Sequence, residues 1–183
     1  MRTSVETFVR PSLPLGFAAL LLTAGTNASV AQPPASPTGA QTVRANLATF
    51  DDLDFNVFSN QKWDQLSRSH ASDILVHWPD GHTTKGIEKH IEDLKAMFVY
   101  APNTRIKVHP VKFGSGEWTS VIGEMEGTFT KPMSAGSGKT IAPTGKAFKL
   151  PMCTVGRWKN GIMVEEYLFW DNQTFMKQIG LGQ

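Results

Sequence analysis

The chain of 183 residues contains a single cysteine, Cys153, and therefore cannot form an internal disulfide. It also lacks a strong excess of one charge, because 18 basic residues face 16 acidic ones. A nucleic-acid-binding surface usually carries a large basic excess, since neutralisation of phosphates dominates its affinity. The charge balance thus argues against a nucleic-acid partner. Because no disulfide can form, packing of the core has to stabilise the fold.

The apolar run near the N-terminus, from Leu13 to Leu22, is too short for a membrane-spanning helix, which needs roughly 20 residues. It follows Arg2 and Arg10 and precedes small residues, a layout typical of a secretory signal peptide. Cleavage after Ala31 leaves 16 basic and 15 acidic side chains. We therefore expect a signal peptide at residues 1–31 and export to the periplasm or the medium, with no membrane association after cleavage.

The segment that follows, residues 32–41, is rich in proline and small residues and has nothing large to bury. This composition predicts a flexible linker. The remaining residues, 42–183, are enough for one hydrophobic core and rarely for two. The sequence therefore predicts a single domain after the linker.

Helical spacing of apolar residues dominates the first half of this domain. It predicts a helix from Thr42 to Phe58, a short helix through Trp63 and Leu66, and a clear amphipathic helix between Gly86 and Pro102. A last helical turn is expected from Thr174 to Ile179.

Alternation of apolar and polar residues dominates the second half, after a short strand at residues 73–78. It predicts strands at residues 105–113, 117–129, 146–158 and 162–170, the last two joined by the hairpin signal Asn160-Gly161. This order favours an α+β fold in which the helices pack on one face of a strongly curved, mostly antiparallel sheet and enclose a pocket. Both faces of the last strand are largely apolar, so we expect the second face to contact another copy in a homodimer.

Five segments carry further information when they are taken together. They are residues 77–81 (HWPDG), 127–129 (GTF), 159–161 (KNG), 165–171 (EEYLFWD) and 178–181 (QIGL). In this order and spacing they resemble the SnoaL-like polyketide cyclase (ester cyclase) family of the NTF2-like superfamily. The resemblance covers the chain from about Ala45 to the C-terminus. It implies a cone-shaped α+β barrel with a deep pocket.

The resemblance also implies cofactor-free acid/base chemistry on an apolar carbonyl substrate. In the family's cyclases an aspartate near the end of the last strand removes a proton next to a carbonyl, and an intramolecular aldol reaction closes a ring. Asp171 is the matching residue. The family also uses a histidine from the preceding strand; this strand has none, and Arg157 is the nearest candidate.

Two residues are candidate catalytic groups. Asp171, among aromatic neighbours, would be partly desolvated, which raises a carboxyl pKa towards that of a general base. The alternative is a helix cap, because Asp171 precedes the last helical turn. His77 at a strand end could serve as acid, base or orienting donor, or could be a core histidine satisfied by the backbone.

Further residues are expected to line the substrate pocket. They are Trp78, Met125, Phe129, Met152, Arg157, Trp158, Glu165 and Tyr167. The apolar ones could equally fill the core, and Glu165 could pair with Lys149 or Arg157. The spacing of His77, His82 and His90 is too irregular to predict a zinc site, so no metal or other cofactor is expected.

These observations predict a cyclase-like enzyme that acts on a small apolar carbonyl compound. A non-catalytic carrier or sensor, which uses the same pocket to hold an apolar ligand, is the alternative. An isomerase or a dehydratase of the same fold is a further one, because a fold alone does not choose among reactions.

Overall fold

The computed structural model describes residues 38–182 of the chain. The first helix, α1 (Gly39–Asp52), begins at the start of this part, where Thr38 caps it. The Thr38 hydroxyl accepts from the backbone N–H of Gln41, and the Gln41 side chain accepts from the backbone N–H of Thr38. This capping box starts the helix three residues before the expected domain boundary at Thr42, so the predicted linker is too long. The predicted signal peptide lies outside the described residues.

The helix predicted to run to Phe58 changes its winding on the way. After Asp52 it continues as a π-helix, η1 (Leu53–Phe58), which buries four side chains, Asp54 among them. A π-turn holds an extra residue and is frequent at functional sites. The expected short helix follows as a 3-10 helix, η2 (Trp63–Arg68), and the expected amphipathic helix as α2 (Ile87–Tyr100).

Seven strands form the main sheet, in the order β2-β1-β9-β8-β5-β3, with β4 also paired to β5. Their bounds are β1 His70–His77, β2 Thr83–Lys85, β3 Arg105–Ile106, β4 Val111–Ser115, β5 Trp118–Thr128, β8 Ala147–Lys159 and β9 Ile162–Phe169. Strands β6 (Met133–Ser134) and β7 (Thr140–Ile141) pair separately. Only β1 and β9, among the described strands, pair in parallel.

The turn between β8 and β9 has the expected chemistry. Asn160 and Gly161 both have positive φ, 51° and 78°, as a tight hairpin turn requires. The hairpin prediction is thus confirmed.

The strand predicted at residues 105–113 is split into β3 and β4. The prediction is therefore wrong for residues 107–110, which lie between these two strands. Pro110 lacks the backbone N–H that a ladder needs. Beside it, His109 bonds to side chains of the first helical segment instead of lying on a continuous strand.

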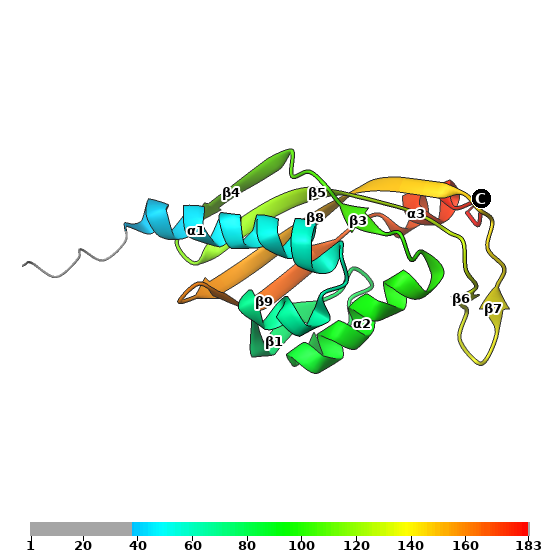
Figure 1. The fold of residues 1–183 in the computed structure, drawn as a ribbon, viewed down its shortest axis with the longest axis horizontal. Helices are drawn as coiled ribbons and strands as arrows, with labels where there is room; N and C mark the ends of the chain where they lie inside the picture. The colour runs from blue at the N-terminus through cyan, green and yellow to red at the C-terminus, as the bar shows by residue number, and fades with distance from the viewer. Residues whose placement is uncertain (1–37, 183) are drawn as a thin grey trace, which may run out of the picture. The chain divides into compact units, whose positions relative to one another are not determined.

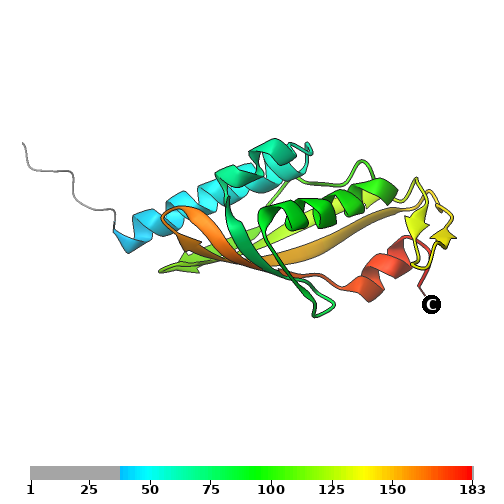
Figure 2. The ribbon, with the colours of Figure 1, turned by 90° about the horizontal axis from the view of Figure 1, so that it is seen from below.

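Helices α1 and α2 lie on one face of the curled sheet, and the core fills the space between them (Figures 1 and 2). The α+β prediction is confirmed. On the opposite face, Phe113, Trp118 and Phe169 are 63%, 41% and 52% exposed, so no part of the described chain covers them. None of the described helices combines the length and apolarity needed to cross a membrane.

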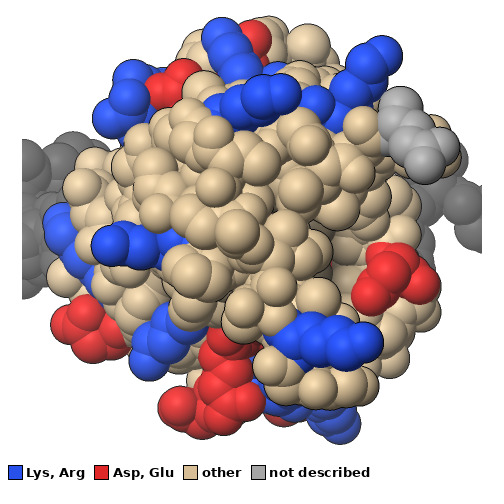
Figure 3. Space-filling model, turned by 90° about the vertical axis from the view of Figure 1, so that its right-hand side faces the viewer, with Lys and Arg blue, Asp and Glu red and all other residues tan. Residues whose placement is uncertain are grey.

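The last helix, α3 (Asn172–Gln178), packs beside β8 and buries Phe175 against Phe148. Figure 3 looks at this end of the molecule, where basic and acidic side chains are interspersed around a largely uncharged centre.

Candidate active site

A small cavity lies inside the molecule, between the helical layer and the sheet. Its walls are largely apolar but include four ionisable side chains: Asp54, His70, His90 and Glu166. The other lining residues are Leu53, Phe58, Leu66, Leu94, Met97, Met152, Thr154, Leu168 and Trp170. About 30 Å³ is open to the centres of water-sized molecules, enough for roughly two waters.

A larger hollow of about 520 Å³, beside Arg105 and Lys149, lies open on the surface. Its acidic residue Glu126 accepts from Lys107 and Arg105, and these hydrogen bonds lower its pKa to about 2. A carboxylate this acidic is a poor base at neutral pH. The internal cavity is therefore the stronger candidate site.

Asp54 reaches the cavity from the first turn of the π-helix, and only 6% of the residue is exposed. Its Oδ2 lies 2.8 Å from Nε2 of His109, whose Nδ1 lies 2.8 Å from Oδ1 of Asp51. Asp51 also pairs with Lys112 at the surface. A chain of polar contacts thus leads from solvent to the cavity wall.

Burial determines how the ionisable groups in this series of polar contacts titrate. It raises the pKa of the Asp54 carboxyl, and the hydrogen bond from His109 offsets only part of that effect. Burial acts the opposite way on His109, but the bonds to Asp54 and Asp51 outweigh it and raise the His109 pKa. A buried carboxylate with a raised pKa, held by a cationic partner, suits a general base.

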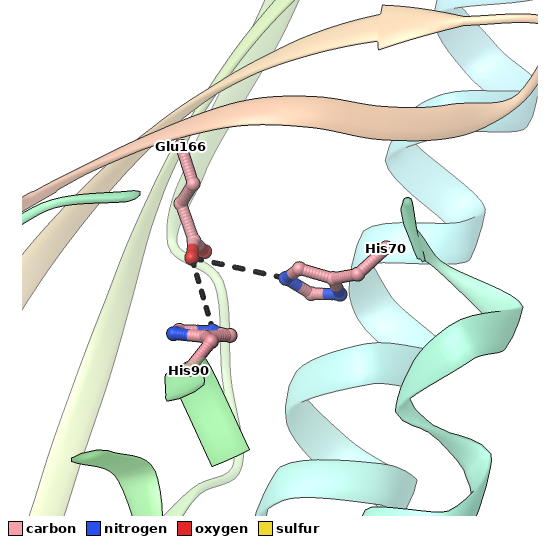
Figure 4. Close-up of side chains that lie close together, drawn as sticks. All are labelled: His70, His90 and Glu166. Carbon is pink, nitrogen blue, oxygen red and sulfur yellow. Dashed lines mark ion pairs between the residues drawn. The ribbon is translucent and has the colours of Figure 1, made fainter. Parts of the chain in front are cut away.

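The other three ionisable groups of the cavity lie close together, with the Glu166 carboxylate next to both histidine rings (Figure 4). Oε2 of Glu166 lies 3.3 Å from Nε2 of His90 and 3.7 Å from Nε2 of His70. Nε2 of His70, Nδ1 of His90 and Oε2 of Glu166 are buried without a hydrogen-bond partner among the described residues. Burial lowers the pKa of His90 to about 4, so its ring is neutral at pH 7.

Of the residues predicted to line the pocket, Met152 does so. Four others, Trp78, Met125, Phe129 and Trp158, are 9%, 3%, 0% and 2% exposed and belong to the hydrophobic core. Trp158 also donates its indole N–H to the Thr119 hydroxyl. The core alternative is correct for these four side chains, which do not line the cavity.

The remaining predicted side chains form a polar cluster on the outer face of the sheet. Glu165 accepts from Arg157 at 2.9 Å and from the Tyr167 hydroxyl at 2.8 Å, and it lies 3.1 Å from Nε2 of His77. The expectation that His77, Arg157, Glu165 and Tyr167 enter the pocket is wrong. Successive strand residues point to opposite faces, and Glu166 rather than Glu165 faces the cavity.

Asp171 is exposed and caps α3. Its Oδ1 accepts from the backbone N–H groups of Gln173 and Thr174, and its Oδ2 accepts from the Thr174 hydroxyl. These hydrogen bonds, led by that of the Thr174 side chain, lower the pKa of Asp171. The expected desolvated carboxylate with a raised pKa is therefore wrong, and the helix-cap alternative is correct.

Four residues of the site were not predicted from the sequence: Asp54, His70, His109 and Glu166. One signal was available for Asp54, a charged residue between the apolar side chains of Leu53 and Phe55 in a helix that packs on the core. His70 lies outside the predicted elements, where spacing carries little information. His109 lies in the middle of the strand predicted at residues 105–113, where the structure has a break between β3 and β4.

Comparisons with solved structures support the fold. A candidate SnoaL-like polyketide cyclase from Jannaschia sp. CCS1 superposes with a TM-score of 0.69 at 17% identity, over 81% of this chain and all of that one. IdmH from Streptomyces antibioticus, a candidate polyketide cyclase, superposes with a TM-score of 0.64 at 20% identity, over 74% of this chain and 98% of the IdmH chain.

An NTF2-like protein of unknown function from Burkholderia pseudomallei K96243 gives a TM-score of 0.60 at 19% identity, over 74% of this chain and 98% of that one. These likenesses confirm the NTF2-like fold. No curated protein matches the chain. The profile of the SnoaL-like polyketide cyclases matches residues 53–179, which include the four ionisable residues of the cavity. The chain therefore belongs to the SnoaL-like polyketide cyclase family.

Proposed function

We propose that the protein is a cyclase-type enzyme that removes a proton next to the carbonyl of a small apolar compound, with Asp54 as the general base. One observation carries the proposal: the Asp54 carboxylate lies buried at a largely apolar cavity and is held from behind by His109. The membership in a family of cyclases supports the reaction type.

The surroundings of Asp54 favour proton abstraction for a simple reason. An ionised carboxylate is costly in an apolar cavity, so taking up a proton relieves part of that cost. His109 fixes one oxygen of the carboxylate and lies behind it, bonded in turn to Asp51. Asp54 is thereby held in one orientation, which favours transfer from a correctly placed substrate.

The proposed reaction balances without a cofactor. Asp54 takes the proton from the carbon next to the carbonyl, and the resulting carbanion attacks a second carbonyl of the same molecule. A carbon–carbon bond forms, the second carbonyl oxygen becomes an alkoxide, and protonated Asp54 returns the proton to it.

Binding of such a substrate requires the cavity to widen, because its present volume accommodates roughly two waters. Met97 and Met152 line it, and methionine side chains are unbranched and adapt to new shapes. We expect their movement to admit a small apolar compound.

Deuterium exchange tests the proposal directly. Candidate ketoesters are incubated in deuterated buffer, and incorporation next to the carbonyl is followed for the wild type and for Asp54→Asn. We expect exchange to fall at least about 100-fold in Asp54→Asn, in line with the loss of a general base. Asp171→Asn is the matched control and should exchange like the wild type.

If Asp54→Asn exchanges as fast as the wild type, Asp54 is not the base. If Asp171→Asn alone loses exchange, the base is the aspartate that the family resemblance implies. An isomerase or a dehydratase would use the same exchange step, and analysis of the products distinguishes these reactions from cyclisation.

A carrier or sensor is the second candidate function, favoured by the largely apolar lining of the cavity. Native mass spectrometry of gently purified protein tests it. A tightly held and chemically unchanged ligand supports a carrier, whereas an empty protein that turns over a ketoester supports the enzyme.

We also infer that the protein acts as an exported homodimer. The proposed signal peptide at residues 1–31 supports export. The exposed apolar side chains Phe113, Trp118 and Phe169 on the outer face of the sheet support self-association, since such groups mark interaction surfaces.

A further inference from the structure

We propose that His70, His90 and Glu166 form a binding site for a divalent metal ion of the zinc class. The three residues come from β1, α2 and β9, and only 2%, 2% and 4% of their surfaces are exposed. Two imidazoles and one carboxylate are a ligand set of catalytic zinc, with a fourth position left for water or substrate. The proposal does not depend on the role of Asp54.

The distances within the cluster agree with this geometry. Zinc bonds of about 2.0–2.1 Å in a tetrahedral arrangement hold the donor atoms about 3.4 Å apart. Oε2 of Glu166 lies 3.3 Å from Nε2 of His90 and 3.7 Å from Nε2 of His70 (Figure 4). All three side chains offer donor atoms within 4.8 Å of one another. Two of the three pairs are thus correctly spaced, and small side-chain rotations would close the third.

Ser69 determines which nitrogen of His70 faces the cluster. Its hydroxyl donates to the carbonyl of Leu66, at 3.1 Å, and so accepts from Nδ1 of His70, at 2.8 Å. In the neutral ring the proton is then on Nδ1, and the bare Nε2 points to the carboxylate of Glu166. Such an outer hydrogen bond is the usual way in which proteins orient a metal-binding histidine.

This tautomer leaves two acceptors facing each other. Nε2 of His70 and Oε2 of Glu166 are both buried, and neither has a hydrogen-bond partner among the described residues. Buried polar atoms are ordinarily paired, so either a second proton on His70 or a metal ion has to lie between them. A metal ion supplies a positive charge and uses both lone pairs, and the adjoining cavity has room for its water.

Metal titration of the mature chain from Gln32 tests the proposal. The protein is stripped with a chelator and titrated with Zn²⁺ by calorimetry, and with Co²⁺ by visible absorption, which reports tetrahedral coordination. We expect one ion per chain, and a melting temperature that rises with the Zn²⁺ concentration because the ion binds only the folded state.

Three variants remove the ligands one at a time: His70→Asn, His90→Asn and Glu166→Gln. Each should weaken Zn²⁺ binding at least about 100-fold. Even the loss of a residue that only hydrogen-bonds to a metal ligand lowers metal affinity about 10- to 100-fold. The matched controls are His77→Asn and Glu165→Gln, which alter the same residue types on the outer face and should bind Zn²⁺ like the wild type.

The proposal is overturned if the folded wild-type protein binds neither ion, or if the three cluster variants bind Zn²⁺ as tightly as the wild type. Circular dichroism verifies folding, and Glu166→Gln keeps the side-chain volume, so it serves if a histidine variant does not fold. Because the readout is metal binding, a negative result in the deuterium-exchange experiment leaves this test unaffected.

Discussion

His109 and Asp54 are bound to each other across 2.8 Å, although 55 residues separate them in the sequence. The contact places an imidazole directly behind the carboxylate proposed as the base. His109 lies in the break between β3 and β4, where the regular ladder with β5 is interrupted and Val108 keeps one backbone hydrogen bond to Glu124.

Replacement of His109 by glutamine should therefore change how Asp54 titrates. Without the cationic partner, the pKa of Asp54 rises further, and the acidic limb of the kcat/KM profile moves to higher pH. We expect a loss of about 2–3 kcal/mol of unfolding free energy, because a buried carboxylate loses its partner. The control is His82→Gln, which changes an exposed histidine that takes no part in these contacts. An unshifted profile in His109→Gln would show that this histidine does not tune the base.

The buried ring of His90 predicts a loss of stability in acid. Its pKa is about 4 in the folded protein and 6.5 in the unfolded chain, so the unfolded chain binds more protons between these values. The contribution of His90 to the free energy of unfolding is therefore fully present above pH 6.5. It is lost as the pH falls towards 4, by about 3 kcal/mol in total.

Urea unfolding between pH 7 and pH 4, in the presence of a chelator, measures this effect. His90→Gln should lose less stability over this range than the wild type. The control is His82→Gln, which changes an exposed histidine and should follow the wild type. Parallel curves for the wild type and His90→Gln would contradict the prediction.

Asp171 should matter for stability. In Asp171→Ala the helix α3 loses the acceptor for two backbone N–H groups, which costs about 1 kcal/mol of unfolding free energy. Thermal unfolding measures the loss. Asp171→Asn retains a capping oxygen and should remain within a few tenths of a kcal/mol of the wild type. A large effect of both variants on turnover, without an effect on stability, would contradict the assignment as a cap.

The outer face of the sheet should mediate self-association. Phe169→Glu places a charge at an exposed apolar position, and we expect it to convert a homodimer to a monomer at micromolar concentration. Analytical ultracentrifugation measures the mass. The control is Val99→Glu, at a position 63% exposed on α2, which lies on the helical layer. A wild type that sediments only as a monomer would rule out the dimer.

The sequence was sufficient to predict the order of the helices and of the long strands, but not the short strands β2, β6 and β7 or the face that lines the cavity. In β9 the alternation correctly separates Glu165 from Glu166, yet both faces carry apolar residues. The predicted pocket residues came from both faces of the sheet, and those on the outer face, Arg157, Glu165 and Tyr167, do not reach the cavity. The two faces of the sheet differ because the helices cover only one of them. The alternation of residues within a strand does not show which face that is.

The cavity itself was beyond prediction for a related reason. Asp54, His70, His90 and Glu166 come from four separate elements, and no local spacing connects them. The π-turn carries Asp54, the pairing of β1 with β9 brings His70 near Glu166, and the packing of α2 on β1 adds His90. Asp171, by contrast, was predictable as a cap, since its neighbours in the sequence are also its partners.

The parallel pairing of β1 with β9 has a consequence for the order of assembly. The first strand of the sheet completes its hydrogen bonds only after the last one has been synthesised, because His70 and Glu166 stand almost a hundred positions apart. The contacts of His70 and His90 with Glu166 therefore form only when β9 is in place. Such long-range closure slows folding, and it makes the docking of β9 the step at which the ionisable interior is sealed from water.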